Sequence, residues 1–297
     1  MVFVRVVTNA KAEDQRQRPK YDTMNNLTYQ FADLSLARRL EKAEANGNVL
    51  FVEARAKAFP ESHAEWIEVA GTYAMFDGPT SPVSQTFCLG MFSPITTDDM
   101  EALELFFKRR GAEVFHEVSP LADASAPALL KERGYLPVEF SNVLFRPISI
   151  DVVISGSPND KVKVDLTKES ERQVWAETAF QGWSEYAEVS GFLREMGKVQ
   201  ACSKSLSFLA KLDSEPIATG MISICDGVAL LAGASTVPKA RCQGAQLALL
   251  EHRLRYGAQQ GCDIAMMATL PGSASQRNAE RHGFRIAYTR IKWQLIH

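Results

Sequence analysis

The chain has 297 residues, enough for one large domain or two of ordinary size. Its 46% hydrophobic and 23% charged residues are typical of a globular protein, and a net charge of −2 without a block of Lys and Arg argues against binding nucleic acid through bulk electrostatics. The five cysteines are odd in number and widely spaced, and the five histidines form no HExxH pattern. We therefore expect reduced thiols, and neither a disulfide framework nor a metal site.

The first residues, MVFVRVV, are too few and too interrupted by Arg5 to form a signal-peptide core. The polar stretch that follows predicts a flexible tail over residues 1–24. No apolar run reaches the length of a membrane span. The sequence thus indicates a cytoplasmic protein that binds neither membrane nor nucleic acid.

Two segments share one pattern, residues 109–147 and residues 259–295. Each runs from a helix end through Gly, a buried strand, a loop, a short helix and a Gly-aromatic pair to a second strand. Gly111 aligns with Gly261, and Gly134 aligns with Gly283 after a single one-residue gap. A repeat of this length suggests two copies of one fold. The Gly, Ser, Pro, Asn and Asp content of residues 149–161 reads as a linker, which predicts domains at 25–150 and 151–297.

The two copies differ at one turn between a strand and a helix. In the first copy QTFCLGMF leads to SPITTDDMEALELF, and in the second ALLAGAST leads to VPKARCQGAQLALL. The first copy is several residues shorter there and keeps an ordinary helix start, Thr96 followed by Asp98 and Asp99. Acidic residues at that position repel a phosphate, so we expect this copy not to bind one in this way.

The second copy predicts a mixed α/β sheet. Alternating or continuous apolar runs predict strands, and apolar residues at helical spacing predict helices. The expected strands are 161–166, 205–213, 217–225, 228–236, 263–270 and 285–295, and the expected helices are 169–183, 188–200, 245–260 and 273–282.

The turn before the helix that starts near residue 245 has the chemistry of an anion site. The first N–H groups of a helix have no internal partner, and the helix dipole places partial positive charge there. Gly244 permits close approach or a positive φ, and Arg241 adds a full charge. Such a site suits a pyrophosphate. The same residues also occur in turns that are merely structural, and they form neither a P-loop nor a GxGxxG motif.

The segment ASTVPKARCQGAQLALLEHRL resembles motif A of the GCN5-related N-acetyltransferases (GNAT), and PGSASQRNAERHGFRIAYTR resembles their motif B. The similarity covers residues 162–295. The two-copy arrangement also resembles bacterial tandem-GNAT proteins whose first copy is degenerate. The resemblance implies two tandem GNAT-like domains, and acetyl-CoA or another acyl-CoA as the co-substrate without a metal. Two departures concern Gln246, where the family has Gly or Ala, and Ala279, where it has the tyrosine that protonates the leaving thiolate.

The resemblance also implies roles for individual residues. It assigns the pyrophosphate to the backbone of Cys242, Gln243, Gly244, Ala245, Gln246 and Leu247, and the pantetheine arm to the backbone of Ser235, Thr236 and Val237. One amide in the second segment would polarise the thioester carbonyl. Asn278 and Arg277 would reach the donor from the short helix, although a solvated surface charge is the simpler interpretation of Arg277.

Direct attack of an amine on the thioester needs a base and an acid. Glu185 is the candidate base and Tyr288 the candidate acid, each with an ordinary structural interpretation beside it. No His or Asp relay can be assigned around Cys242, which argues against a covalent mechanism. The aromatic residues Trp183, Phe192 and Trp293 line a pocket or fill a core.

The leading hypothesis is an N-acetyltransferase whose active site lies in the C-terminal domain and whose acceptor is a small-molecule or peptide amine. A non-catalytic acyl-CoA-binding or sensor protein is the alternative, motivated by the missing tyrosine. A nucleotide-binding module of another kind is a third possibility, disfavoured because Walker and Rossmann motifs are absent. We expect the first domain to pack against the second and to complete or cover the acceptor cleft.

Overall fold

The computed structural model describes residues 27–151, 159–183 and 190–296, without the side chains of 190–193. The expected tail and the centre of the expected linker lie outside these ranges. Among the described residues, no helix combines the length and apolar character that a membrane crossing requires. The helices are α1 (Leu34–Ala58), α2 (Thr97–Lys108), α3 (Ser125–Glu132), α4 (Arg172–Gly182), α5 (Ser190–Cys202), α6 (Ala245–Gln259) and α7 (Ala274–Arg281).

The described strands form one eleven-stranded mixed sheet in the order β1-β2-β3-β4-β11-β5-β10-β9-β8-β7-β6. Strands β3 and β4 pair in parallel, as do β9 and β10, and the other neighbours are antiparallel. The mixed α/β sheet expected from the sequence is therefore confirmed. The bounds are β1 (Glu65–Val69), β2 (Thr72–Phe76), β3 (Gln85–Phe87), β4 (Phe115–Val118), β5 (Tyr135–Pro147), β6 (Val162–Leu166), β7 (Leu206–Leu212), β8 (Glu215–Cys225), β9 (Val228–Thr236), β10 (Ile264–Thr269) and β11 (Arg285–Leu295).

The repeat seen in the sequence is visible in the order of elements. A three-stranded antiparallel meander, a helix, a parallel strand, a short helix and a long strand follow one another twice: β1-β2-β3-α2-β4-α3-β5, then β7-β8-β9-α6-β10-α7-β11. The aligned glycines Gly111 and Gly261 follow α2 and α6, and both adopt a positive φ, 65° and 83°. That conformation suits glycine, which explains why the same residue recurs after each helix.

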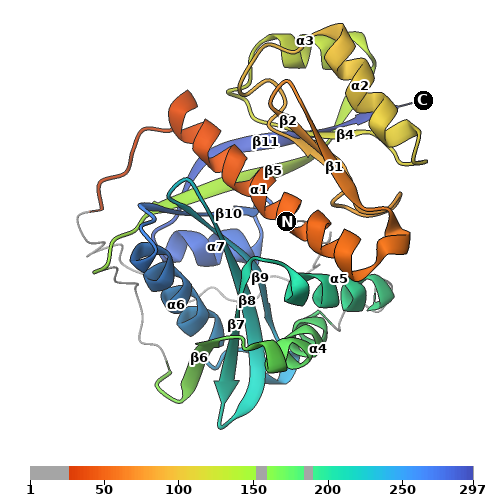
Figure 1. Cartoon of the computed structure of the whole chain (residues 1–297). Helices are drawn as coiled ribbons and strands as arrows, with labels where there is room; N and C mark the ends of the chain where they lie inside the picture. The colour runs from red at the N-terminus through yellow and green to blue at the C-terminus, as the bar shows by residue number, and fades with distance from the viewer. Residues whose placement is uncertain (1–26, 152–158, 184–189, 297) are drawn as a thin grey trace.

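The two halves exchange their last strands. Strand β11, from the end of the chain, lies between β4 and β5, and β5 lies between β11 and β10. Asn142 of β5 thus pairs with Thr269 on one side and with Thr289 on the other. In Figure 1 these two strands run across the middle of the molecule, from the upper half into the lower one. The halves share one continuous sheet, while a domain boundary near residue 150 stays a prediction.

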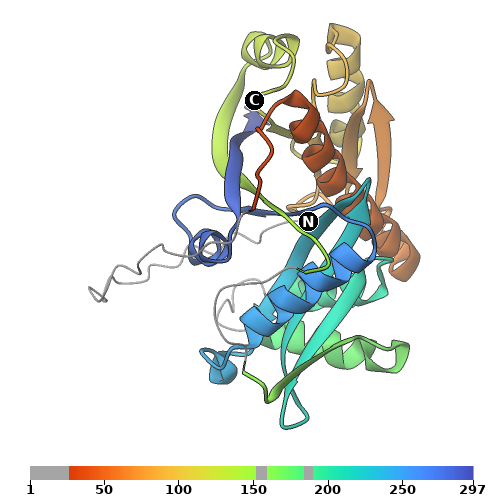
Figure 2. The same cartoon turned by 90° about the vertical axis from the view of Figure 1, so that its left-hand side faces the viewer.

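Helices cover both faces of the C-terminal part of the sheet. Helix α1 packs on the face that carries Val228, Leu230 and Met266, whereas α6 packs on the face that carries Ala229 and Ala265. The two views of the cartoon place α1 and α6 on opposite sides of the strands (Figures 1 and 2). Leu249 and Leu254 of α6 are fully buried. Each such side chain stabilises the fold by roughly 1.5–3 kcal/mol.

Besides sharing strands in one sheet, the first half packs against the second through α1. Arg39 forms an ion pair with Asp263, and Lys42 donates to Asp226 at 2.8 Å, so α1 is fixed over the starts of β9 and β10. Farther along, Gly47 meets β8 and β9 so closely that a Cβ there would lie 2.7 Å from Leu230. The expected packing of the first half against the second is present.

Candidate functional site

The strands β9 and β10 diverge, and the site lies where they part. Their parallel pairing covers only Val228–Leu230 against Ile264–Met266. Beyond these residues β9 continues beside β8 alone as far as Thr236, and β10 continues beside β5 alone as far as Thr269. The edge of β9 that faces β10 therefore carries backbone groups that the sheet leaves unpaired, available to an extended ligand.

Strand β9 contains a bulge at the same level. Ala232 stands opposite Met221, and Ser235 stands opposite Thr219, so Gly233 and Ala234 together oppose the single residue Gly220. Gly233 has a φ of 59°, the left-handed conformation that glycine favours at such bulges. The bulge interrupts the regular ladder between β8 and β9, and the carbonyl oxygen of Gly233 accepts instead from the Oγ1 of Thr219 on β8 at 3.3 Å.

The chain then turns into α6 without a side-chain cap. Gly244 occupies the position before the helix with a φ of 83°, and no side chain accepts a hydrogen bond from the first helical amides. Within the described part of the chain, none of the six amides from Cys242 to Leu247 donates a hydrogen bond. These amides and the positive end of the helix dipole make the 242–247 loop an anion-binding surface.

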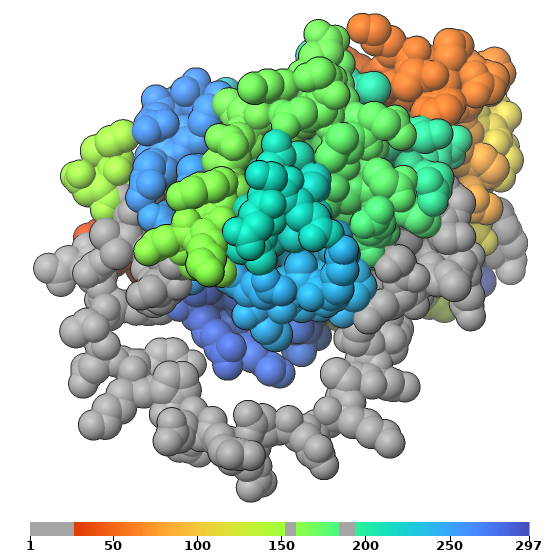
Figure 3. Space-filling view, turned by 90° about the horizontal axis from the view of Figure 1, so that it is seen from below, coloured from red at the N-terminus to blue at the C-terminus, as the bar shows by residue number. Residues whose placement is uncertain are grey.

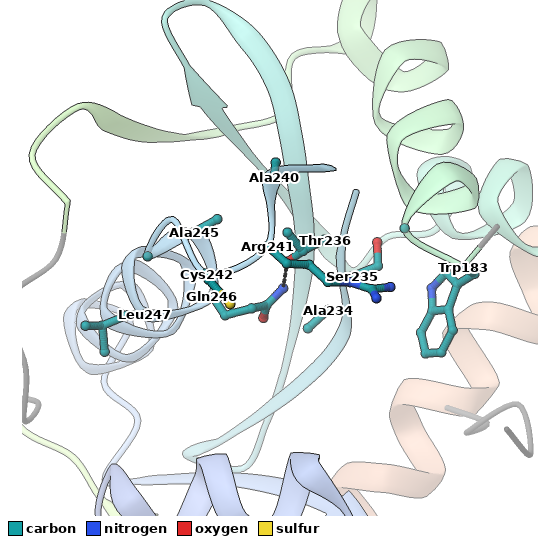
Figure 4. A pocket seen from close by; sticks show the side chains of 12 residues that line it. Trp183, Ala234, Ser235, Thr236, Ala240, Arg241, Cys242, Ala245, Gln246 and Leu247 are labelled. Carbon is teal, nitrogen blue, oxygen red and sulfur yellow. Dashed lines mark hydrogen bonds between the residues drawn. The ribbon is translucent and has the colours of Figure 1, made fainter. Parts of the chain in front are cut away.

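A cavity of about 430 Å³ joins this loop to the end of β9. Figure 4 shows Arg241 reaching into the space between them, with Trp183 at its far side. The Nε2 of Gln246 donates to the Oγ1 of Thr236 at 2.6 Å and so links the helix start to the strand end. From below, the turn after β9 reaches the surface next to the β7–β8 hairpin (Figure 3). The lining residues are Gly182, Trp183, Ala234, Ser235, Thr236, Ala240, Arg241, Cys242, Gly244, Ala245, Gln246 and Leu247.

Helix α4 forms the second wall of the cavity and fixes the end of β9. A Cβ on Gly182 would lie 2.5 Å from the Oγ of Ser235, so only glycine lets the helix end this close to the strand. The Oγ of Ser235 lies 2.9 Å from the Oγ1 of Thr219 and 3.3 Å from the carbonyl oxygen of Ala179. The strand end is thereby held rigidly. Gly182 was not predicted as a site residue, and the sequence marks it only as a glycine near the end of an expected helix.

The 242–247 loop is supported from behind by Asn159. Its Nδ2 donates to the carbonyl oxygen of Gln243 at 3.0 Å, and a Cβ on Gly244 would lie 3.1 Å from the Cβ of Asn159. Gly244 is therefore required both by its positive φ and by this close approach. Asn159 was also missed, because nothing in the local sequence links it to a loop far along the chain.

Eight of the residues predicted to bind the donor line the cavity: Ser235, Thr236, Arg241, Cys242, Gly244, Ala245, Gln246 and Leu247. Three others lie outside its lining. Val237 is buried and donates its amide hydrogen to the carbonyl oxygen of Ile217, while the carbonyl oxygen of Gln243 accepts from Asn159. Asn278 is exposed on α7, as is the neighbouring Arg277.

The two catalytic candidates have different outcomes. Glu185 lies outside the described residues. Tyr288 lies in the interior between β11 and α1, where its hydroxyl donates to the Oε1 of Glu41 at 2.8 Å, and it does not line the cavity. Burial raises the pKa of Tyr288 well above its ordinary value. A phenol that is held by a buried carboxylate is poorly placed to protonate a thiolate in the cavity.

Tyr288 belongs to a buried ionic cluster that connects α1 to β11. Arg290, 2% exposed, lies 2.9 Å from an oxygen of Glu44 and within 3.6 Å of Glu41 and Glu117. Burial raises the pKa of Glu41 to about 7, with Arg290 acting in the opposite direction and Glu44 adding to the rise. Three carboxylates around one guanidinium thus leave Glu41 as the group that holds a proton.

The three aromatic residues predicted to line a pocket or fill a core lie in different places. Trp183 lines the cavity, whereas Trp293 packs beside the core of the first half. The side chain of Phe192 lies outside the described residues. In the described part of the chain, no group of three or more His, Cys, Asp or Glu side chains is gathered as metal ligands would be.

Diverging parallel strands, a bulge close to the point of divergence and an uncapped helix start thus meet at this cavity. Residues 170–284 match the model of the acetyltransferase (GNAT) family. Residues 170–284 thus form a GNAT domain, and the resemblance drawn from the two sequence motifs is confirmed for this part of the chain. No curated protein sequence matches the chain.

Solved structures share the fold at low sequence identity. A GCN5-related N-acetyltransferase from Kribbella flavida superposes with a TM-score of 0.56 at 20% identity, over 83% of this chain and 94% of that one. A functionally unknown conserved protein from Staphylococcus epidermidis ATCC 12228 gives 0.55 at 10% identity, over 81% and 96%. A tandem GNAT protein from the clavulanic acid biosynthesis pathway gives 0.51 at 12%, over 76% and 78%.

Proposed function

We propose that the protein transfers an acetyl group, or another acyl group, from its coenzyme A thioester to an amine by direct attack, at the cavity of the C-terminal half. Membership of the GNAT family supports acyl transfer in general. The observation that carries the proposal is the row of six amides from Cys242 to Leu247 that donate no hydrogen bond within the described chain. An anion with several acceptor oxygens, such as a diphosphate, satisfies them.

The donor is expected to lie along the cavity in one direction. The diphosphate occupies the 242–247 loop beside Arg241, and the pantetheine arm follows the unpaired edge of β9 past Thr236 and Ser235. The thioester then reaches the bulge at Gly233 and Ala234. Backbone N–H groups directed at the carbonyl oxygen favour the charge that develops there during attack.

The reaction forms a bond between the amine nitrogen and the acyl carbon and breaks the carbon–sulfur bond. The amine loses one proton, and the departing thiolate gains one. The described lining of the cavity contains no carboxylate, imidazole or phenol. We therefore assign the base to Glu185 or to water, and expect no acid role for Tyr288, which is buried against Glu41.

The same observation favours a second candidate function. A cavity that binds an acyl-CoA without an acid or base in its described lining suits a non-catalytic acyl-CoA-binding or sensor protein. The two candidates share the donor site and differ in whether an acceptor is acylated. For the enzyme, the acceptor is expected to be a small-molecule or peptide amine.

One assay separates the two. The protein is incubated with acetyl-CoA and a panel of small-molecule and peptide amines, and free thiol is measured over time. Thiol release that depends on both protein and amine supports the acyltransferase. Calorimetric binding of acetyl-CoA without release over a broad panel supports the sensor. Binding of ATP but not of coenzyme A contradicts both.

A further inference from the structure

Arg253 on α6 is a buried arginine that has no role in the reaction as proposed above. It is 3% exposed, and among the described residues no carboxylate forms an ion pair with it. Burial lowers the pKa of Arg253 to about 10, so its guanidinium still carries its charge at neutral pH. An isolated buried charge is costly and is retained only where hydrogen bonds compensate for lost water.

The compensation comes from three backbone carbonyls. The Nε of Arg253 donates to the carbonyl oxygen of Leu249 at 3.1 Å, and its Nη1 donates to those of Met221 and Ala232 at 3.2 Å each. Met221 and Ala232 face each other on β8 and β9, directly before the bulge. One guanidinium thus joins α6 to both strands at the level where β9 leaves its regular pairing.

Gly220 makes room for this guanidinium. A Cβ at position 220 would lie 3.0 Å from the Cζ of Arg253, 3.1 Å from its Nε and 3.2 Å from its Nη1. Glycine within a strand weakens it, and an unpaired arginine within a core destabilises it. Gly220 and Arg253 are each unfavourable in these positions. They meet at the bulge, where Gly233 and Ala234 together oppose Gly220.

We propose that Arg253 is a positioning residue for acyl transfer: it holds the β9 bulge so that backbone N–H groups meet the thioester carbonyl, and its buried charge stabilises the oxygen as that oxygen becomes negative. The proposal rests on the proposed function. Arg253 neither gives nor accepts a proton in this step. The nitrogen–carbon bond forms and the carbon–sulfur bond breaks while the guanidinium stays charged behind the strand.

This role predicts different effects on binding and on turnover. The 242–247 loop begins α6, whereas Arg253 lies two helical turns further along, so diphosphate binding does not involve its guanidinium. In Arg253→Met, which keeps much of the side-chain length without the charge, we expect the Kd of coenzyme A to change by less than about threefold. We expect kcat to fall by about 10- to 100-fold, somewhat less than the loss of a direct oxyanion donor. Arg253→Lys is expected to recover part of kcat.

Two further variants separate the role of Arg253 from the general effect of changing a residue on α6. Arg255→Met removes a neighbouring arginine that pairs with Glu251 on the outer face of α6, and it is expected to leave both values unchanged. Gly220→Ala keeps Arg253 but displaces its guanidinium, and it is expected to lower kcat in the same direction as Arg253→Met. If Arg253→Met does not fold, Arg253→Lys and Gly220→Ala carry the test.

The experiment measures turnover together with the affinities for coenzyme A and for acetonyl-CoA, a stable analogue that keeps the carbonyl. A selective fall in kcat, with a loss of preference for acetonyl-CoA over coenzyme A, supports the proposal. An unchanged kcat in folded variants overturns it, as does a parallel loss of coenzyme A affinity. If the wild type binds both ligands but transfers nothing, the acyltransferase fails, and the carbonyl preference alone decides the role of Arg253. If the wild type binds neither ligand, both proposals fail.

Discussion

The two halves contain the same strand–turn–helix unit, but they satisfy the helix start in opposite ways. At α2, the hydroxyl of Thr96 accepts from the amide of Asp99, and the carboxylate of Asp99 accepts from the amide of Thr96. The turn before it is joined to α3, because the amide of Ile95 donates to the Oγ of Ser125 at 2.8 Å. At α6 no side chain caps the helix, and a cavity lies in front of it.

The packing of the short helix α3 adds to the difference between the two corners. In the first half α3 rests on the turn so closely that a Cβ on Gly90 would lie 2.9 Å from the Cβ of Ala126. Asp98 and Asp99 place negative charge at the start of α2, whereas Arg241 places positive charge beside α6. The same topology therefore becomes a closed structural corner where the protein supplies its own acceptors, and an open anion site where it does not.

The largest expected effect comes from Gly244→Glu. The substitution puts a side chain on a left-handed residue against Asn159 and places a negative charge in the loop. We expect the affinity for coenzyme A to fall by about 100-fold or more, since the dipole and the amides then face a carboxylate of the protein itself. Isothermal titration calorimetry measures it. The matched control is Gly111→Glu, with a φ of 65° and open space around it, which is expected to keep the affinity. Unchanged affinity in folded Gly244→Glu contradicts the assignment.

A second effect concerns pH and the cluster that connects the halves. The pKa of Glu41 is raised from 4.5 to about 7. Between these two pH values the folded protein therefore holds a proton on Glu41 that the unfolded chain has lost. Its contribution to the free energy of unfolding is complete below pH 4.5 and declines as the pH rises towards 7, by on the order of 2–3 kcal/mol.

Comparison of the wild type with Glu41→Gln isolates this dependence from other groups. The neighbours Arg290, Glu44, Glu117 and Tyr288 are the same in both proteins. Urea denaturation between pH 4.5 and 8 is expected to show a smaller decline in Glu41→Gln. Parallel curves for the two proteins contradict the shift.

A smaller effect is expected at the closed corner. Thr96→Ala removes the cap of α2 and should lower the free energy of unfolding by about 1 kcal/mol. Thermal unfolding measures this loss, and titration with coenzyme A should give the wild-type affinity. A changed affinity contradicts the view that this corner is only structural.

The smallest effect is expected at Gln246. Its carboxamide crosses the cavity to Thr236, as Figure 4 shows, and has one remaining N–H for a ligand. Gln246→Ala should weaken the binding of coenzyme A by about three- to tenfold, the value of one or two neutral hydrogen bonds. Tighter binding in Gln246→Ala would show that the side chain obstructs the donor.

Local signals in the sequence sufficed for the elements of the second half. The continuous apolar run before Thr269 predicted β10, and the spacing of Leu247, Leu250 and Leu254 predicted α6. The two motifs also predicted the position of the 242–247 loop, because the strand, the turn and the helix start that form it are consecutive in the chain. Helix α1 was not predicted, because Glu41, Glu44 and Asn48 on its buried face obscure the apolar pattern.

Other features depend on contacts that no local pattern contains. The exchange of β5 and β11 follows from which edges meet in the folded sheet, and the position of Tyr288 against Glu41 follows from that exchange. Gly182 and Asn159 support the site through close approaches to residues far along the chain. Arg253 reads in sequence as an exposed charge on a helix, and only the three-dimensional structure shows it under the bulge.

The most direct test of the account is a crystal structure of the full chain with bound coenzyme A. It should show the diphosphate accepting hydrogen bonds from the amides of residues 242–247, the pantetheine arm along β9, and no ligand at the corner between Thr96 and Asp99. A diphosphate seated elsewhere, or at the start of α2, would contradict it.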